Sequence, residues 1–158
     1  MEYFQKDNNI ISLLYVEDEP VIRGLIQKVI SRKFPTMKIH LAEDGKAGLE
    51  LFKKICPDIL LADINLPELN GILMVSEIRK LNPKTEIIII SGQEKVCYES
   101  DCVKFGISRY LNKPILHEEL FKAIEDSIAC ITSKRKLRQL LIQDEDKEVL
   151  IPQVVFQS

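Results

Sequence analysis

Short apolar runs alternate with longer amphipathic stretches along this chain. Residues 10–16, 59–62 and 87–90 are almost entirely apolar, and the last of these runs consists of four consecutive isoleucines. Continuous apolar runs of this length, rich in β-branched residues, are typical of strands buried on both faces. We therefore predict three buried strands there and two shorter strands at residues 37–42 and 109–111.

The segments between these runs carry apolar residues every three or four positions, which is the spacing of an amphipathic helix. Pro20 favours a first helical turn, and the side chain of Asp44 can cap the next helix. Pro35, Pro57 and Pro83 mark the points where the first three helices should end. The helices are expected at residues 20–34, 45–56, 72–81, about 95–105 and 116–131.

Five strand–helix units in succession predict an α/β fold. Each helix must cross from one strand to the next and pack back on the sheet, which favours right-handed crossovers and a parallel sheet. The expected architecture is a doubly wound, five-stranded parallel sheet with flavodoxin-like (βα)5 topology in three αβα layers. In that topology the strands at residues 10–16, 59–62 and 87–90 lie next to one another.

The periodic pattern weakens after residue 131. A basic run at residues 134–138 is followed by acidic residues at 144–146 and an apolar segment at 149–156. We predict one domain over residues 8–131, with residues 132–158 as a helical extension and tail. This tail would either dock on a surface or lead into an output domain. We expect the basic run to be a solvated helix end that interacts with the helix dipole.

Composition narrows the class of protein. A length of 158 residues fits a single domain, and 22 lysines and arginines against 24 acidic residues leave a net charge of −2. Nucleic acid is therefore not an expected partner of this domain, since no strong basic field exists. No apolar stretch is long enough to cross a membrane and no signal-peptide core is visible, so a cytoplasmic location is the default expectation. We interpret the four cysteines, Cys56, Cys97, Cys102 and Cys130, as reduced thiols.

Polar side chains follow four of the predicted strands directly. Glu17 and Asp18 come after the first strand, Asp63 after the third, Ser91 after the fourth and Lys113 after the fifth. Parallel strands present their carboxyl ends at one edge of the sheet, so these five side chains should meet there. Three clustered carboxylates repel one another unless a cation lies between them, and Mg²⁺ prefers such oxygen ligands. Lys113 would supply a second positive charge.

This set contains the parts needed to transfer a phosphoryl group to a carboxylate: a nucleophile, a metal, a cation and a hydroxyl donor. Asp63 is the expected nucleophile because it stands alone at the end of the middle strand. Glu17 and Asp18 form a pair suited to holding the metal directly or through water.

Several motifs resemble one family, the receiver domain of bacterial two-component response regulators. The resemblance covers about residues 10–131. The motifs are the acid pair Glu17-Asp18, the segment Pro57-Asp58-Ile59-Leu60-Leu61-Ala62-Asp63, the dipeptides Leu66-Pro67, Asn70-Gly71 and Ser91-Gly92, and the segment Tyr110-Leu111-Asn112-Lys113-Pro114.

The resemblance implies that Asp63 takes a phosphoryl group from the phosphohistidine of a sensor histidine kinase or phosphotransfer protein. It also implies an Mg²⁺ ion among Glu17, Asp18, Asp63 and the backbone carbonyl of Asn65. The protein would then be a signalling switch, and its chemistry would be confined to its own phosphorylation and dephosphorylation.

The resemblance further implies how such a switch works. Ser91 and Lys113 would hold the phosphoryl oxygens, Tyr110 would rotate inward, and the Lys113-Pro114 bond would be a cis peptide. The face of the fourth helix, fifth strand and fifth helix would be remodelled for a downstream target or output domain. The same face is where a homodimer would form.

Two other functions remain open at this stage. A receiver-like scaffold would dock on its partner without accepting phosphate, although Asp63, Ser91 and Lys113 are all present. A haloacid-dehalogenase-like phosphatase would also use a strand-end aspartate and Mg²⁺, but that class carries a second aspartate two residues later. This chain has Asn65 there. Nucleotide-binding enzymes are disfavoured because no GxxxxGK[ST] or GxGxxG motif occurs.

Overall fold

The computed structural model describes residues 9–92 and 99–149, and strands and helices alternate through them. The first strand and helix are β1 (Ser12–Val16) and α1 (Pro20–Lys33). The remaining elements are β2 (Lys38–Ala42), α2 (Gly45–Ile55), β3 (Ile59–Asp63), α3 (Gly71–Leu81), β4 (Glu86–Ser91), α4 (Glu99–Phe105), β5 (Arg109–Asn112) and α5 (His117–Val149).

All five strands are parallel and lie in the order β2-β1-β3-β4-β5. The register pairs Val16 of β1 with Ala62 of β3, Ala62 with Ile89 of β4, and Ile89 with Tyr110 of β5. The carboxyl ends of these four strands are therefore level with one another. The predicted doubly wound, flavodoxin-like sheet is confirmed.

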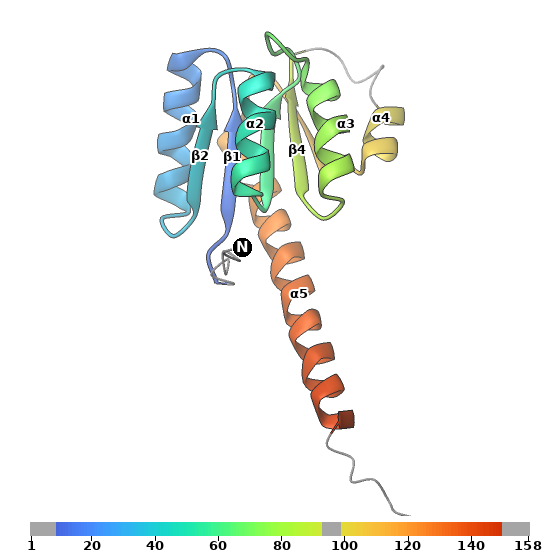
Figure 1. The fold of residues 1–158 in the computed structure, drawn as a ribbon. Coiled ribbons are helices and arrows are strands. Elements are labelled where there is room, and N and C mark those ends of the chain that lie inside the picture. Colours follow the sequence, from blue (N-terminus) through green and yellow to red (C-terminus); the bar gives the residue numbers. More distant parts are fainter. Residues whose placement is uncertain (1–8, 93–98, 150–158) are drawn as a thin grey trace, which may run out of the picture.

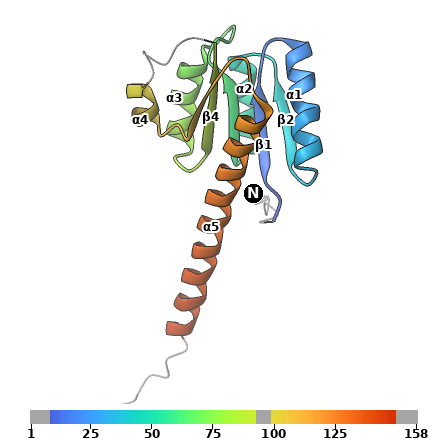
Figure 2. The same ribbon diagram turned by 180° about the vertical axis from the view of Figure 1, so that it is seen from behind.

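Helices cover both faces of the sheet, as Figure 1 and the reverse view in Figure 2 show. Leu13 and Tyr15 of β1 belong to the core cluster that includes residues of α1 and α5. Leu14 and Val16 belong to the other cluster, with residues of α2 and α3. Every residue of β1 is buried, because alternate side chains enter opposite core layers. This double burial explains why the strands read as continuous apolar runs.

The predicted helix starts agree closely with the structure. The side chain of Asp44 accepts a hydrogen bond from the backbone N–H of Ala47 at 2.7 Å, as a helix cap does. Asn70 accepts from the N–H of Ile72 at 2.8 Å, so α3 begins one residue before the predicted start. The described part of the fourth helix is α4, and the rest of the stretch predicted from about residue 95 lies outside the described residues.

Helix α5 is 33 residues long and runs past residue 131 without a break, projecting from the domain in Figures 1 and 2. The basic run is not the predicted helix end, because α5 continues to Val149, whereas Lys134, Lys136 and Arg138 are exposed as expected. Nζ of Lys134 lies 3.5 Å from Oε1 of Glu86, and Nη2 of Arg135 donates to Oδ1 of Asp58 at 2.9 Å. The helix leaves the domain beside the residues that begin β3 and β4, so two of the basic side chains bind there.

Two further observations bear on the expectations from composition. No helix within residues 9–92 and 99–149 is both long and apolar enough to cross a membrane. Cys56 and Cys130 are not part of a disulfide. The side chains of Cys97 and Cys102 lie outside the described part of the chain.

Candidate functional site

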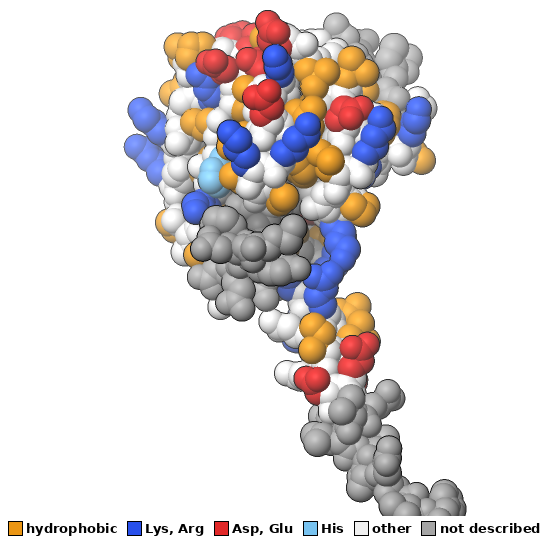
Figure 3. All heavy atoms as spheres, in the orientation of Figure 1, with side chains coloured by type: hydrophobic (Ala, Val, Ile, Leu, Met, Phe, Trp, Pro, Cys, Tyr) orange, Lys and Arg blue, Asp and Glu red, His pale blue; other side chains and the backbone are white. Residues whose placement is uncertain are grey.

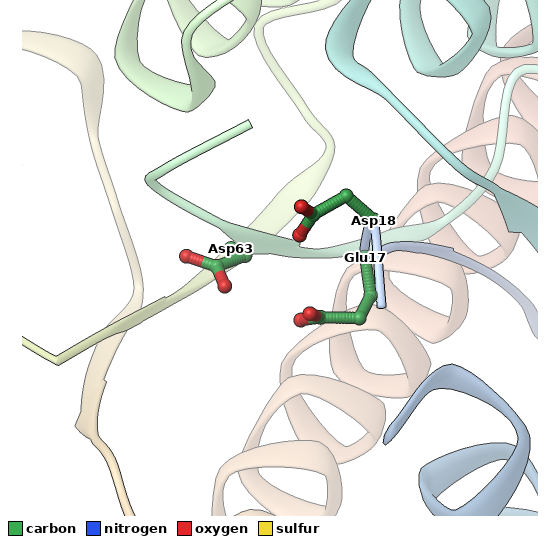
Figure 4. A group of neighbouring side chains, drawn as sticks. All are labelled: Glu17, Asp18 and Asp63. Carbon is green, nitrogen blue, oxygen red and sulfur yellow. The ribbon is translucent and has the colours of Figure 1, made fainter. Parts of the chain in front are cut away.

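Three carboxylates meet at the carboxyl edge of the sheet. Glu17 and Asp18 directly follow β1, and Asp63 ends the neighbouring strand β3. Each offers a carboxylate oxygen, and these oxygens lie within 4.8 Å of one another. Figure 4 shows Glu17 and Asp18 extending from the end of β1 toward the end of β3. Parallel pairing of β1 with β3 brings together residues that are 46 and 45 positions apart in the sequence.

The three carboxylates differ in burial. Glu17 is completely buried and Asp63 is 2% exposed, whereas Asp18 lies in solvent. Burial and, to a lesser extent, the negative charge of Asp63 raise the pKa of Glu17 to about 7 against the opposing effect of Lys113. Crowded, partly desolvated carboxylates of this kind fit a hard divalent cation with oxygen ligands such as Mg²⁺.

Lys113 reaches the same cluster from the segment after β5. Its Nζ donates a hydrogen bond to Oδ2 of Asp63, and its backbone N–H donates to the carbonyl of Ser91 at 2.8 Å. Burial lowers the pKa of the Lys113 ammonium, but the hydrogen bond and charge of Asp63 outweigh burial, and the pKa is raised overall. The peptide bond between Lys113 and Pro114 is cis.

Ser91 and Tyr110 occupy positions beside this cluster. Ser91 is fully buried at the end of β4, one residue beyond the partner of Asp63 in the register of β3 and β4. Tyr110 is half-buried and packs against the core cluster shared by α2 and α3. The positions of both side chains suit a response to a group bound at Asp63, and their switch role stays a prediction.

The loop after β3 contacts the carboxylate of Asp63 through a backbone N–H group. The backbone N–H of Asn65 donates to Oδ1 of Asp63 at 3.0 Å, and that of Gly71 donates to the carbonyl of Ile64 at 2.9 Å. A Cβ on Gly71 would lie 2.5 Å from the carbonyl oxygen of Asp63, so only glycine fits there. Asn65 therefore touches the nucleophile candidate through its N–H, and the predicted metal contact of its carbonyl stays a prediction.

Two residues of the site were missed by the reasoning from sequence. The hydroxyl of Tyr15 donates to Oε2 of Glu17 at 3.5 Å, and Nη1 of Arg23 donates to the carbonyl of Glu17 at 2.7 Å. Strand alternation could have revealed Tyr15, because residues two apart point to the same face. Arg23 gave no such signal, since its contact depends on how α1 turns back over the loop.

Comparison with known proteins bears directly on this arrangement. The family model described as "Response regulator receiver domain" matches residues 13–125. The "Protein-glutamate methylesterase/protein-glutamine glutaminase" of Treponema denticola is 32% identical over 107 residues, which is 66% of this chain and 28% of that protein. The chain thus spans less than a third of the length of this relative.

Solved structures of other proteins are also similar to this chain. The N-terminal domain of an uncharacterized protein from Wolinella succinogenes is 31% identical, with a TM-score of 0.71 and coverage of 78% of this chain and 98% of that one. A response regulator receiver domain protein from Clostridium thermocellum is 26% identical, with a TM-score of 0.71 and coverage of 80% and 98%. The sequence, fold and strand-end residues of the present chain together show that it belongs to the response regulator receiver domain family.

Proposed function

We propose that the protein is a phosphorylation-dependent switch in which Asp63 accepts a phosphoryl group from the phosphohistidine of a histidine kinase or phosphotransfer protein. The observation that carries this proposal is the position of Asp63. It is a buried carboxylate that contacts a lysine ammonium and has an oxygen within 4.8 Å of oxygens of two further carboxylates. A merely structural aspartate at a strand end has no need of such neighbours.

The transfer step balances with the residues present. A carboxylate oxygen of Asp63 attacks phosphorus, a P–O bond forms, and the P–N bond to the donor imidazole breaks with its electron pair on nitrogen. The Lys113 ammonium already contacts one oxygen of Asp63, so it lies where the phosphoryl oxygens would arrive and would neutralise part of their charge. Hydrolysis by water would later restore the carboxylate, and we propose no further reaction for this domain.

Glu17, Asp18 and Asp63 would hold Mg²⁺, with the carbonyl of Asn65 as a fourth protein ligand. When bound, the ion would offset the repulsion between carboxylates and phosphoryl oxygens. The fit rests on the short distances between three oxygen ligands and on the raised pKa of Glu17, which follows from burial and from the negative charge of Asp63.

The output would be a changed protein surface. A phosphoryl group adds charge and acceptor oxygens beside Ser91, whose hydroxyl would turn toward it, and Tyr110 would follow. Ser91 ends the strand that precedes α4 in the chain, and Tyr110 lies on the strand that follows it, so the face of α4, β5 and α5 would change for a downstream target or output domain.

The phosphodonor protein would approach next to α1. Val21 and Leu25 are 72% and 58% exposed, and they lie one turn apart on α1, which begins two residues after Asp18. Exposed apolar side chains beside a reactive edge are suited to binding another protein.

The proposal is tested by incubating the full chain with acetyl phosphate and Mg²⁺ and measuring its intact mass. We expect the gain of one phosphoryl group, its loss in Asp63→Asn, and its persistence in Asp126→Asn, a matched change at an exposed aspartate of α5. Chelation of Mg²⁺ should block uptake while the helical circular dichroism stays unchanged, because neither core cluster contains the acidic residues. An unmodified mass, beside a control receiver that is modified, would favour a phosphate-independent scaffold instead.

A further inference from the structure

The part of α5 beyond the domain carries an apolar stripe. Ile131 is buried and the described side chains of this helix beyond it are not, and Leu137, Leu140 and Leu141 are each more than half exposed. Spacings of three and four residues place these leucines on one side of the helix, and we call them the leucine stripe. Three exposed leucines on a projecting helix form an apolar surface that nothing within the described residues covers.

Charge is divided on either side of the leucine stripe. The basic run at residues 134–138 lies next to the domain, and the acidic run at residues 144–146 lies farther out. Figure 3 shows this order along the helix as blue, then orange, then red. The helix therefore presents basic, apolar and acidic segments in sequence. A second copy running in the opposite direction would place its acidic segment beside the basic segment of the first and its apolar segment beside the apolar one.

We propose that this projecting segment forms an antiparallel two-helix dimer with a second copy of the chain. Lys134, Leu137, Leu141 and Asp144 follow one another at spacings of three, four and three residues, as a helix-pairing seam does. In an antiparallel pair centred near residue 139, Leu137 lies opposite Leu141 and Lys134 opposite Asp144. Two-fold symmetry repeats both contacts.

A parallel pair would be opposed by the same charges. Lys134 would lie against Lys134 of the second copy, and Asp144 against its own counterpart. Only the antiparallel arrangement brings the basic run of each copy to the acidic run of the other. Charge thus selects the orientation, and the leucine stripe supplies the apolar contact.

The domain holds the helix in a direction that suits this pairing. Lys134 bonds to Glu86 and Arg135 to Asp58 at the point where α5 leaves the sheet, so the segment beyond projects at a defined angle. Lys134 keeps 61% of its side chain exposed despite this contact, which leaves it accessible to a second copy. The two domains would lie at opposite ends of the paired helices.

The interface is small compared with the roughly 1,200–2,000 Å² of a stable protein complex. We therefore expect a dimer that forms at high protein concentration, and one that salt weakens because oppositely charged runs meet. Sedimentation equilibrium of the full chain, without any phosphodonor, measures both properties. A chain that remains monomeric up to millimolar concentration overturns the proposal.

Matched leucine variants test the surface. Leu141→Ala should raise the dimer dissociation constant at least about tenfold, because each dimer loses two buried leucines. Leu73→Ala on α3 removes a leucine of the same 58% exposure and should leave the constant unchanged. Equal effects of the two variants would overturn the proposal. Both positions are exposed, and a thermal melt confirms that each variant folds.

Charge reversal tests the pairing. Asp144→Lys should weaken the dimer, and adding Lys134→Asp should restore it, since the pair is then reversed in sign. Failure of the second change to restore the dimer, in a chain that melts normally, contradicts the antiparallel seam.

Disulfide trapping tests the orientation. In chains whose four native cysteines are replaced by serine, a mixture of Leu137→Cys and Leu141→Cys variants should form the mixed disulfide. In an antiparallel pair two Leu137→Cys chains are offset by about four residues, or about 6 Å along the helix, beyond their sideways separation. Predominant crosslinking of Leu137→Cys with itself would show a parallel pair and overturn the proposal.

Discussion

Nζ of Lys113 donates a hydrogen bond to Oδ2 of Asp63 across 50 positions of sequence. The lysine follows the edge strand β5, and the aspartate ends the central strand β3. The ammonium reaches past the end of β4 to do so. This contact neutralises one of three clustered carboxylates, and it marks the side from which a phosphoryl group would be held.

Removing the lysine of this pair should destabilise the fold, whereas removing the charge of the aspartate should not. Lys113→Met leaves the buried Asp63 carboxylate without its cation, and we expect the free energy of unfolding to fall by about 1–3 kcal/mol. Asp63→Asn removes one of three repelling charges, so its stability should equal or exceed that of the wild type. Urea titrations in metal-free buffer measure both, and a stable Lys113→Met variant would contradict the role of this pair.

Stability should fall as pH rises through the range in which Glu17 ionises. Burial raises the pKa of Glu17 from 4.5 to about 7 in the folded chain, so between these values the folded state binds more protons than the unfolded state. The contribution of Glu17 is therefore fully present below about pH 4.5 and lost by about pH 7. Thermal melts without metal from pH 5.5 to 8 should show this decline.

Glu17→Gln provides the control for the pH dependence. The amide cannot ionise, so the decline should flatten, and at pH 8 the variant should be more stable than the wild type by about 1–3 kcal/mol. An unaltered pH dependence in Glu17→Gln would mean that another group is responsible.

The ion pair between Arg135 and Asp58 should stabilise the domain measurably. Asp58 also accepts from the backbone N–H of Ser12 at 2.9 Å and from the hydroxyl of Ser12 at 3.3 Å, so Asp58→Ala loses these contacts together with the ion pair and should cost about 2 kcal/mol. Arg135→Gln loses the ion pair with Asp58 and should cost about 0.5–1 kcal/mol. Arg138→Gln, an exposed arginine on the same helix, should change stability by less than about 0.5 kcal/mol.

A double-mutant cycle separates the ion pair from the other contacts of Asp58. The combined Asp58→Ala and Arg135→Gln chain should be more stable than the sum of the single effects predicts, by about 0.5–1 kcal/mol. Strict additivity would show that the two side chains do not interact in solution.

Arg79 should be required for the order of α4. Its guanidinium donates to the carbonyls of Phe105 at 2.7 Å, Gly106 at 3.0 Å and Thr85 at 3.0 Å, and so joins the end of α4 to the loop before β4. A fourth bond goes to the carbonyl of Asn82 at 3.3 Å, and Arg79→Lys cannot reproduce this divergent set, so the variant should lose about 2 kcal/mol of stability. Hydrogen exchange should become faster in residues 103–108.

Lys80→Ala is the matched control for Arg79. This neighbouring lysine pairs with Glu77 on the exposed face of α3, where both side chains are more than half in solvent. Its loss should change stability by less than about 0.5 kcal/mol and leave exchange in α4 unaltered. Similar behaviour of the two variants would contradict the role of Arg79.

The local pattern of the sequence determined the fold class. The buried strands and the starts of α2 and α3 follow from apolar periodicity and from capping side chains, which act over a few residues. The four-isoleucine strand at residues 87–90 could hardly be anything but central, since a sheet buried on both faces needs apolar residues at successive positions. Because the ends of parallel strands share an edge, the sequence alone also indicated which polar side chains would gather.

Only the tertiary structure decided how these side chains differ. Glu17 and Asp18 are neighbours in the chain, yet one is fully buried and the other exposed, because the packing of α1 and β3 around the loop sets their burial. The contact of Arg135 with Asp58 and the carbonyl contacts of Arg79 likewise link segments far apart in the sequence. No periodicity encodes such contacts, since they depend on how whole elements pack, whereas patterns of hydrophobicity record only which face of an element is buried.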